Sequence, residues 1–176
     1  EVSQAQRRAL LRPAAHGPLR VMFPFVTGVE ELRAARQVVA RAAETLRARG
    51  VSVPQVPIGI MIEVPSAALM ANNFAKEVNF LCLGTNDLIQ YTLAVDRMNE
   101  RIAHLYEPTH PAIIRLIKAT VDAAHAQRIG VSVCGEMAGD PVLAPLLLGL
   151  GVDELSAAPS LVPTVKFVIR RLKFTE

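Results

Sequence analysis

The sequence predicts an α/β fold in which helices cover a parallel sheet. Apolar runs of strand length alternate along the chain with segments of helical periodicity. Each strand-like run is almost continuously apolar, which is typical of strands in a parallel sheet. Periodicity alone leaves the choice between an open doubly wound sheet and a βα barrel open. Polar residues gather where these runs end, and because barrels carry their sites at the carboxyl ends of strands, we expect part of a (β/α)8 barrel, about five βα units long.

Five strands are expected, one for each apolar run of suitable length. They cover residues 19–26, 58–64, 78–83, 131–134 and 152–155. Turn sequences follow four of them, and these turns hold Glu63, Asp87, Glu136 and Ser156. A site formed by this chain should therefore lie along one edge of the sheet.

Helical patterns are expected between the strands. A short helix covers residues 3–11. The clearest helix starts at Thr27, where Thr27 and Glu30 have the spacing of a capping box, and stops at Gly50. Pro111 opens a further helix that ends at Gly130.

Two more helices are expected near the C-terminus. Pro141 opens a helix over residues 142–150, and its nearly uniform apolarity predicts burial on most sides. A final helix around residues 161–172 ends in cationic side chains, which suit a helix C-terminus.

Length and composition exclude several classes of protein. The chain has 176 residues, of which 51% are hydrophobic, so it can bury one core and forms one domain or a large piece of one. No apolar run reaches the roughly 18 residues of a membrane span, and no signal peptide is recognised. Cys82 and Cys134 lie in apolar strand-like runs, which favours a reducing compartment and hence the cytoplasm. The net charge of +3 comes without a basic tract, so nucleic acid is not an expected partner.

Two carboxylates follow adjacent strands. Glu63 ends an apolar run, where desolvation of a carboxylate is costly unless something offsets it. Asp87 ends the next strand, so the two carboxylates could converge on one hard cation such as Mg2+, with substrate oxygens and water completing its shell. The alternative is that Glu63 caps a helix and Asp87 closes a turn. Spacing alone leaves both interpretations open.

Three further residues are candidates for the same edge. Asn86 could donate to a phosphate, although Asn in a strand-to-helix turn is commonly a capping residue. Arg97 lies on a polar connection where a guanidinium could hold a phosphate or carboxylate in a bidentate fork, although most loop arginines are only solvated. Cys134 ends its strand before a glycine, so its thiol could open into the site, although a buried inert thiol is the commoner case.

The remaining chemistry-bearing residues carry no recognisable pattern. The histidines lie in loops or on a helix without metal-ligand spacing: His16, His104, His110 and His125. The chain has no Gly-x-Gly-x-x-Gly, P-loop, serine elbow or Cys-x-x-Cys motif, so we do not expect ATP binding in this segment.

Three segments resemble the phosphoenolpyruvate-utilising enzymes. They are GIMIEVP at residues 59–65, GTNDLIQYTLAVDR at residues 84–97 and CGEMAGD at residues 134–140. Residues 91–97 and 99–111 are most similar to the Enzyme I branch, the phosphoenolpyruvate-protein phosphotransferases of the bacterial sugar phosphotransferase system. Pyruvate phosphate dikinase and phosphoenolpyruvate synthase share the core motifs less closely. The resemblance runs from about Leu10 to Leu172.

The resemblance implies a phosphoenolpyruvate-binding (β/α)8 barrel that dimerises. In this family the phosphoryl group passes from phosphoenolpyruvate to a histidine on a separate N-terminal domain and then to the small carrier protein HPr, and pyruvate is the other product. By family motif, the site residues are the magnesium ligands Glu63 and Asp87, the phosphate contact Asn86, the substrate-binding Arg97 and the proton donor Cys134. Metal and arginine would neutralise charge on the transferring phosphoryl group.

The chain also departs from the family. A complete barrel takes about 250 residues and eight strands, whereas five strand signals are found here. The earlier strands with their arginines, and the phosphohistidine domain, have no counterpart in these residues. We therefore expect residues 1–176 to form a partial barrel domain that is inactive alone and associates through unpaired sheet edges. Two alternatives remain at this point: a dikinase or synthase relative, and a non-catalytic dimerisation module.

Overall fold

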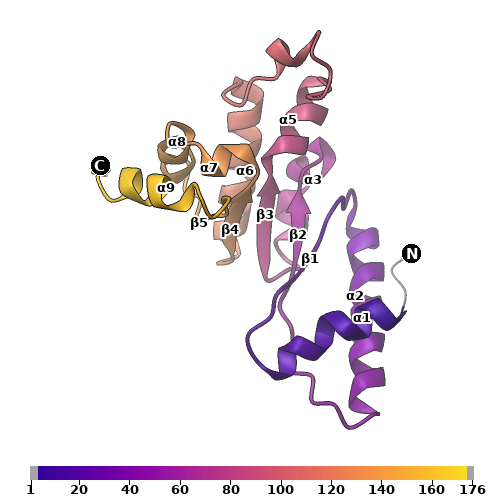
Figure 1. Cartoon of the computed structure of the whole chain (residues 1–176). Helices are drawn as coiled ribbons and strands as arrows, with labels where there is room; N and C mark the ends of the chain where they lie inside the picture. The colour runs from indigo at the N-terminus through magenta and orange to yellow at the C-terminus, as the bar shows by residue number, and fades with distance from the viewer. Residues whose placement is uncertain (1–3, 174–176) are drawn as a thin grey trace.

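The computed structural model describes residues 4–173, and its centre is one parallel sheet of five strands (Figure 1). The strands are β1 (Val21–Phe23), β2 (Ile58–Ile62), β3 (Phe80–Gly84), β4 (Gly130–Cys134) and β5 (Glu154–Leu155). They pair in the order β1-β2-β3-β4-β5, all parallel. All five expected strands are present. A doubly wound sheet reverses its strand order midway, whereas a barrel does not, so the strict sequential order confirms the barrel-type prediction.

A contact across the sheet indicates that it curls. The guanidinium of Arg20, just before β1, lies 3.9 Å from the carboxylate of Glu154 on β5 and 5.5 Å from the centre of the Phe80 ring on β3. Four strand spacings of about 4.8 Å would put β1 and β5 about 19 Å apart in a flat sheet. The ion pair therefore requires that the two outer strands bend toward each other, as strands do in a barrel wall.

Helices fill the connections between the strands. The α-helices are α1 (Gln4–Leu11), α2 (Val29–Arg47), α3 (Pro65–Leu69), α4 (Ala71–Phe74), α5 (Thr85–Leu93), α6 (Pro111–Ala126), α7 (Glu136–Gly139), α8 (Leu143–Gly149) and α9 (Val162–Ile169), with short 3-10 helices η1 (Arg12–Ala15) and η2 (Ala103–Leu105). All five predicted helices are present with shifted ends, and residue 3 of the first one lies outside the described residues. The short helices α3, α4 and α7 fall below the length at which periodicity is informative.

Alternation along the strands gives the sheet two different faces. One face packs against the helices and forms the main core: Ile60, Ile62, Leu81, Leu83, Val131 and Val133 from the sheet, with Phe74, Ile113, Ile117 and Val121 from the helices. The opposite face, here called the inner face, carries Met61, Phe80, Cys82, Ser132, Cys134 and Glu154. The inner face corresponds to the interior of a barrel.

The start of α2 differs from the prediction. No capping box joins Thr27 and Glu30, because the helix begins at Val29 with Gly28 as its N-cap. Instead, the carboxylate of Glu31 accepts hydrogen bonds from the backbone N–H of Thr27 at 2.9 Å and from its hydroxyl at 3.2 Å. The predicted end is confirmed: Gly50 takes a left-handed φ of 77°, and the chain closes with hydrogen bonds typical of a Schellman motif.

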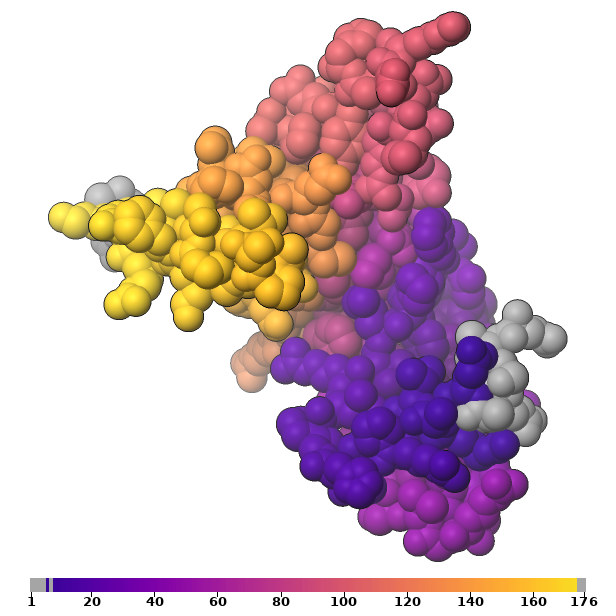
Figure 2. Space-filling view, in the orientation of Figure 1, coloured from indigo at the N-terminus to yellow at the C-terminus, as the bar shows by residue number. Residues whose placement is uncertain are grey.

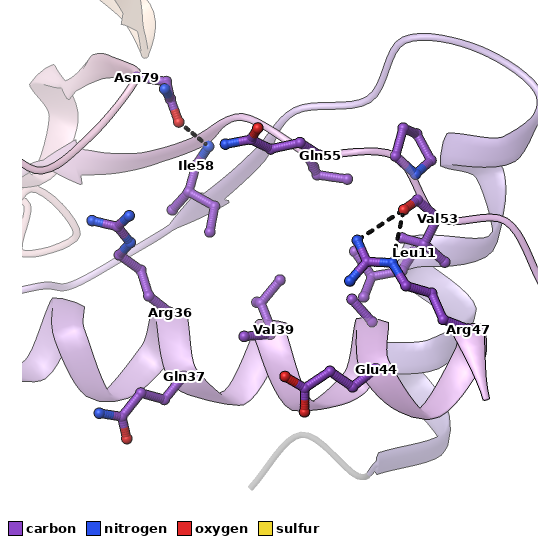
Figure 3. A pocket seen from close by; sticks show the side chains of 14 residues that line it. Leu11, Arg36, Gln37, Val39, Glu44, Arg47, Val53, Gln55, Ile58 and Asn79 are labelled. Atoms are coloured by element: carbon purple, nitrogen blue, oxygen red, sulfur yellow. Dashed lines mark hydrogen bonds between the residues drawn. The ribbon is translucent and has the colours of Figure 1, made fainter.

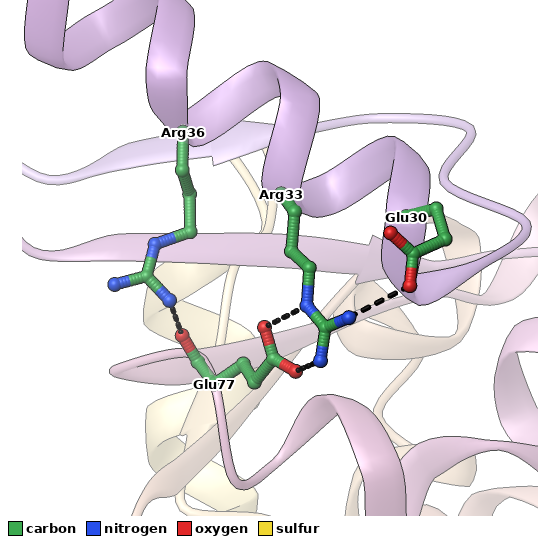
Figure 4. Close-up of polar contacts among 4 residues, drawn as sticks. All are labelled: Glu30, Arg33, Arg36 and Glu77. Carbon is green, nitrogen blue, oxygen red and sulfur yellow. Dashed lines mark hydrogen bonds and ion pairs between the residues drawn. The ribbon is translucent and has the colours of Figure 1, made fainter.

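Polar contacts fix α2 beside the sheet (Figure 4). The guanidinium of Arg33 bonds both carboxylate oxygens of Glu77, at 2.7 and 3.2 Å, and also the carboxylate of Glu30 at 2.7 Å. Arg36 donates to the backbone carbonyl of Glu77 at 2.6 Å. Glu77 precedes β3, so α2 is tied to the entrance of the central strand.

The far half of α2 packs with α1 around a second, smaller core. This core contains Leu11, Ala42, Ala43, Leu46 and Val53. A cavity of about 390 Å³ lies beside it, between α2 and the segment leading into β2 (Figure 3). Its two arginines donate to backbone carbonyls, Arg47 to that of Val53 and Arg36 to that of Glu77. The lining residues Ile58 and Asn79 place the cavity beside the amino ends of β2 and β3. We assign no ligand to this cavity.

The helix α8 is less buried than its sequence predicts. Ala144 and Leu147 are buried, but the other residues of α8 are partly or fully exposed, and Val142 before it is 77% exposed. In the described part of the chain α8 contacts mainly α7 and α9, so one of its faces points away from the molecule. The space-filling view shows this C-terminal part projecting to one side (Figure 2).

Among the described residues, none of the helices has both the length and the apolarity needed to cross a bilayer.

Candidate functional site

The five predicted site residues all lie at or beyond the carboxyl ends of β2, β3 and β4. Glu63 follows β2, Asn86 and Asp87 lie in the first turn of α5 directly after β3, and Cys134 ends β4. Arg97 lies on the loop after α5, and its guanidinium is 3.9 Å from the carboxylate of Asp87. Parallel strands end at one edge, and this brings together residues that are far apart in the sequence.

Glu63 is a buried carboxylate with one hydrogen-bond donor. It is 3% exposed, and its Oε1 accepts a 2.7 Å hydrogen bond from the backbone N–H of Phe25, in the loop after β1. Burial raises the pKa of Glu63, and the neighbouring carboxylate of Asp87 raises it further, while the Phe25 N–H opposes both. Two carboxylates thus face each other with too few donors to satisfy their charge.

The donor at Phe25 is held in an unusual backbone conformation. Phe25 has a φ of 53°, in the left-handed region that aromatic residues seldom occupy. Its ring packs edge-on against Tyr91 on α5, with centroids 6.1 Å apart. Such strain is commonly found where the surrounding structure fixes a functional group. Here it points an N–H at the carboxylate of Glu63.

Gly84 makes room for Glu63. A Cβ at position 84 would lie 2.9 Å from the Cβ of Glu63 and 2.8 Å from the sulfur of Met61. Real Cβ atoms do not approach that closely, so any side chain at this position would displace the carboxylate. A glycine is therefore needed at the end of β3 to leave space for the carboxylate of Glu63.

The carboxylate pair fits a hard divalent cation. Carboxylate oxygens are the donors that Mg2+ prefers, and Mg2+ commonly takes one or two of them together with substrate oxygens and water. Among residues 4–173 no group of three or more His, Cys, Asp or Glu side chains forms a metal cluster. The chain thus offers Glu63 and Asp87 as a two-carboxylate half of a site, not a closed protein cage.

Asn86 is oriented by the loop after β4. Its side-chain oxygen accepts a 2.9 Å hydrogen bond from the backbone N–H of Glu136, which leaves the amide NH2 free to donate to a ligand. Gly135 permits this contact, because a Cβ there would lie 2.8 Å from that oxygen and 2.6 Å from the hydroxyl of Thr85. Gly135 also has a φ of 100°, which favours glycine. The ends of β3 and β4 are thereby joined.

Arg97 is anchored through its backbone, and its side chain lies over the site. Its N–H donates to the side chain of Gln90 at 3.2 Å. The guanidinium lies near Tyr106, whose hydroxyl donates to the backbone carbonyl of Asn86 at 3.3 Å. Burial raises the pKa of Tyr106, and Arg97 opposes this rise. Arg97 is 3.9 Å from the one carboxylate it faces, too far for a tight pair, so its fork of donors can serve an anionic ligand.

Cys134 has a second thiol beside it. Its sulfur lies 3.7 Å from that of Cys82 on β3, and both side chains project from the inner face. The hydrogen bond with Cys82, burial and the carboxylate of Glu63 together raise the pKa of Cys134. The thiol is therefore protonated at neutral pH. The hydroxyl of Thr85 bonds the Cys134 carbonyl at 2.9 Å and fixes the end of β4.

Several residues of this site were not identified from the sequence. Phe25 contributes a backbone N–H, which no side-chain pattern signals. Gly84 and Gly135 carry no prediction of their own, although a glycine at a strand end followed by polar residues is a usable sign of close packing. Cys82 was predicted only to lie in an apolar strand-like run, and its even spacing from Gly84 within that strand could have placed it on the inner face.

The family comparison covers nearly the whole chain. The family model described as "PEP-utilising enzyme, PEP-binding domain" matches residues 1–174. Curated relatives named phosphoenolpyruvate-protein phosphotransferase include those of Enterococcus faecalis, 49% identical over 98% of this chain, and Listeria monocytogenes, 48% identical over 100% of it. The chain spans about 30% of the length of these relatives.

Solved structures share the fold at low sequence identity. A malate synthase from Haloferax volcanii matches with a TM-score of 0.70 and 16% identity, covering 98% of this chain and 52% of that one. A citrate lyase from Burkholderia xenovorans matches with a TM-score of 0.66 and 22% identity, covering 94% and 53%. These likenesses support the barrel-type fold alone. The match to the family model over residues 1–174, with the curated relatives, shows that this chain belongs to the PEP-binding domain family of the PEP-utilising enzymes.

Proposed function

We propose that this chain is the phosphoenolpyruvate-binding part of a phosphoenolpyruvate-protein phosphotransferase. The reaction passes the phosphoryl group of phosphoenolpyruvate to a protein histidine and on to HPr, the first step of the sugar phosphotransferase system, and leaves pyruvate. Relatives of about 49% identity carry that enzyme's name, which favours it over a dikinase or synthase. The chain covers only part of those relatives, so the histidine and the HPr surface are expected elsewhere in the protein.

The observation that carries the proposal is the convergence at the strand ends. A buried carboxylate, Glu63, faces Asp87, and the guanidinium of Arg97 lies 3.9 Å from the latter. A site that presents anionic oxygens and a cationic fork together suits a divalent cation with a phosphate-bearing anion. A module that serves only for dimerisation has no need of a buried carboxylate, Glu63, beside a second one, Asp87.

Positioning and charge stabilisation are the contributions we assign to Arg97 and Asn86. Phosphoryl transfer passes through a transition state in which charge is spread over the equatorial oxygens, and donors fixed around those oxygens lower its energy. Arg97 would hold the phosphate or carboxylate of the substrate in a fork, and the NH2 of Asn86 would donate to a phosphate oxygen. Because the loop after β4 fixes Asn86, this donor needs little reorganisation.

Cys134 is the proposed proton donor. When the phosphorus–oxygen bond of phosphoenolpyruvate breaks, the enolate of pyruvate remains, and its methylene carbon must gain a proton to give pyruvate. The thiol of Cys134 lies at the strand end and is neutral at the relevant pH, because its surroundings raise its pKa. It would give its proton to that carbon and recover one from solvent.

Magnesium is the cofactor we propose, held by Glu63 and Asp87. When bound, it supplies positive charge beside the phosphoryl oxygens. We also propose that the protein acts in the cytoplasm and works as a homodimer; the partly exposed apolar helices α8 and α9 are in keeping with a partner surface. No nucleic acid or membrane partner is proposed.

The test is calorimetric titration of phosphoenolpyruvate into the chain with and without Mg2+. We expect binding that requires Mg2+ and that is lost in Asp87→Ala, because that variant removes one of the two carboxylates. A matched control is Asp122→Ala, which removes an exposed carboxylate on α6 that pairs with Lys118. Binding that persists in Asp87→Ala at unchanged affinity, or that ignores Mg2+, would contradict the proposed site.

A further inference from the structure

The two cysteines form a close pair, and the proposed phosphoryl transfer gives a role to Cys134 but none to Cys82. Cys82 and Cys134 are the only cysteines of the chain. Their sulfurs lie 3.7 Å apart on neighbouring strands, and neither forms a disulfide. Cys82 is 5% exposed, whereas Cys134 is partly open toward the strand ends. A small solute that reaches the site can therefore reach the pair through Cys134.

The distance between the two sulfurs matches the distance between two thiolate ligands on a tetrahedral metal ion. Two thiolates on Zn2+ lie about 2.3 Å from the metal, and at a tetrahedral angle this places the two sulfurs about 3.8 Å apart. The observed separation of 3.7 Å differs from that value by less than the usual variation of such sites. The metal could bind without any movement of β3 or β4.

A disulfide is a poorer use of the same pair. Cys82 pairs with Ser132, and Cys134 pairs with Gly84, so the two cysteines are diagonal neighbours two residues out of register. With a rise of about 3.3 Å per residue and strands about 4.8 Å apart, their Cα atoms are about 8 Å apart. Disulfides require Cα separations of roughly 4.4 to 6.8 Å, so oxidation would have to move the central strands.

We propose that Cys82 and Cys134 form a binding site for a thiophilic divalent cation of the zinc class, Zn2+ or Cd2+, on the inner face of β3 and β4. Binding replaces two S–H bonds by two metal–sulfur bonds and releases two protons to solvent, with no oxidant or reductant. The remaining coordination positions are filled by water. This site is distinct in chemistry from the carboxylate pair, because hard Mg2+ prefers oxygen and the softer cation prefers sulfur.

The site is expected to be exchangeable and not structural. Structural zinc sites use four protein ligands, whereas no group of three or more His, Cys, Asp or Glu side chains suited to a metal occurs in the described part of the chain. Two thiolates with water give a site that loads and unloads with metal supply. If the proposed function holds, a loaded site would block catalysis, because the thiol assigned as proton donor would be a metal-bound thiolate.

The test is titration of the reduced chain with Cd2+, followed by the ultraviolet absorption that arises when thiolate binds cadmium. With only two cysteines in the chain, any such absorption reports this pair. We expect one cadmium per chain, displacement by Zn2+, and no displacement by excess Mg2+. Both Cys82→Ser and Cys134→Ser should weaken binding at least tenfold, about 1.4 kcal/mol. Asp122→Ala, which removes an exposed carboxylate on α6 paired with Lys118, should leave the affinity unchanged.

A second measurement does not depend on how the variants fold. Zn2+ should protect both thiols of the unmodified chain from alkylation by a maleimide, at the zinc concentrations that displace cadmium. One cadmium for two chains, equal affinity in a single-cysteine variant, or alkylation unaffected by zinc would each overturn the proposal. Failure of the chain to bind phosphoenolpyruvate would not overturn the proposed metal site, because cadmium binding and alkylation do not depend on the substrate.

Discussion

Glu63 is a residue whose ionisation opposes folding. Burial, with the help of Asp87, raises its pKa above the 4.5 of an ordinary glutamate. The folded chain thus holds this proton more tightly than the unfolded chain does, so stability falls as the pH rises from about the unfolded pKa through the folded one. We expect Glu63→Gln to raise the free energy of unfolding of the metal-free chain at neutral pH, measured by urea denaturation. The variant should gain little at a pH below 4.5.

Exposed Glu44→Gln is a suitable control for this prediction, since it removes one negative charge on α2, beside the cavity at the amino ends of the strands. An unchanged or lower stability of Glu63→Gln at neutral pH, with the control neutral, would show that the buried carboxylate is satisfied without a cation.

Magnesium should offset the destabilisation that the ionised carboxylate of Glu63 causes in the metal-free chain. A ligand that binds only the folded chain stabilises it by about 2.7 kcal/mol at a hundred times its dissociation constant. Mg2+ should therefore raise the denaturation midpoint of the unmodified chain, and chelation should lower it again. Glu63→Gln should respond weakly or not at all. Equal responses of the two proteins would place the cation elsewhere.

Gly84 allows a test of packing next to the site. In Gly84→Ala the new Cβ would lie within 3.0 Å of both Met61 and Glu63. Such overpacking costs roughly 1–3 kcal/mol, and the displaced carboxylate should also weaken cation binding. Gly149→Ala is the matched control, because nothing lies within 4 Å of its Cβ position. Denaturant unfolding and metal titration of both variants check the prediction.

The sequence predicted that Glu63, Asp87 and Cys134 lie at or just after strand ends, and the structure has them there. Glu63 was noticeable because a carboxylate after an apolar run is costly, and the structure indeed buries it. Phe25 could not be predicted, since its contribution is a backbone N–H set by an unusual φ. The contact between Cys82 and Cys134 depends on the register of β3 and β4, which the sequence of neither strand contains.

Among the elements, α2 is held by an ion pair whose strength depends on pH. Arg33 lowers the pKa of Glu77, chiefly through the side-chain hydrogen bond, so this contribution to stability is present above the unfolded pKa of about 4.5 and is lost as the pH falls through the folded one. We expect Arg33→Gln to reduce stability modestly at neutral pH, and less at high salt or in acid. Exposed Arg41→Gln on the same helix is the control. A loss independent of pH and salt would indicate packing by the arginine stem instead.

Element boundaries were harder to predict than element types. The capping box expected at Thr27 and Glu30 was wrong because the neighbouring Glu31 makes the contact while Glu30 pairs with Arg33. Glu31 lies four residues after Thr27, outside the capping-box spacing, but three residues after Gly28, the residue at which the chain actually enters the helix. The burial predicted for α8 was wrong because apolarity does not reveal how many neighbours surround a helix.

At the scale of the whole molecule, stability should be distributed unevenly. Strands β2, β3 and β4 each pair on both sides, whereas in the described residues β1 pairs only with β2 and β5 only with β4. The second core between α1 and α2 is separate from the main one. We expect hydrogen exchange to be slowest in β3 and its neighbours and faster in β1, β5 and α1. Uniform protection across all five strands would indicate that the chain opens as a single unit.

The sequential strand order also bears on how the chain is made. Each strand pairs with the strand that follows it, so a completed βα unit always finds its partner already synthesised. Contacts between near neighbours in sequence favour rapid folding, and domains fold from the N-terminus as they leave the ribosome. The sheet can therefore grow by one strand at a time during translation. The site would form late and in steps. Asp87 joins Glu63 when β3 is added to the sheet, and Cys134 joins both when β4 is added.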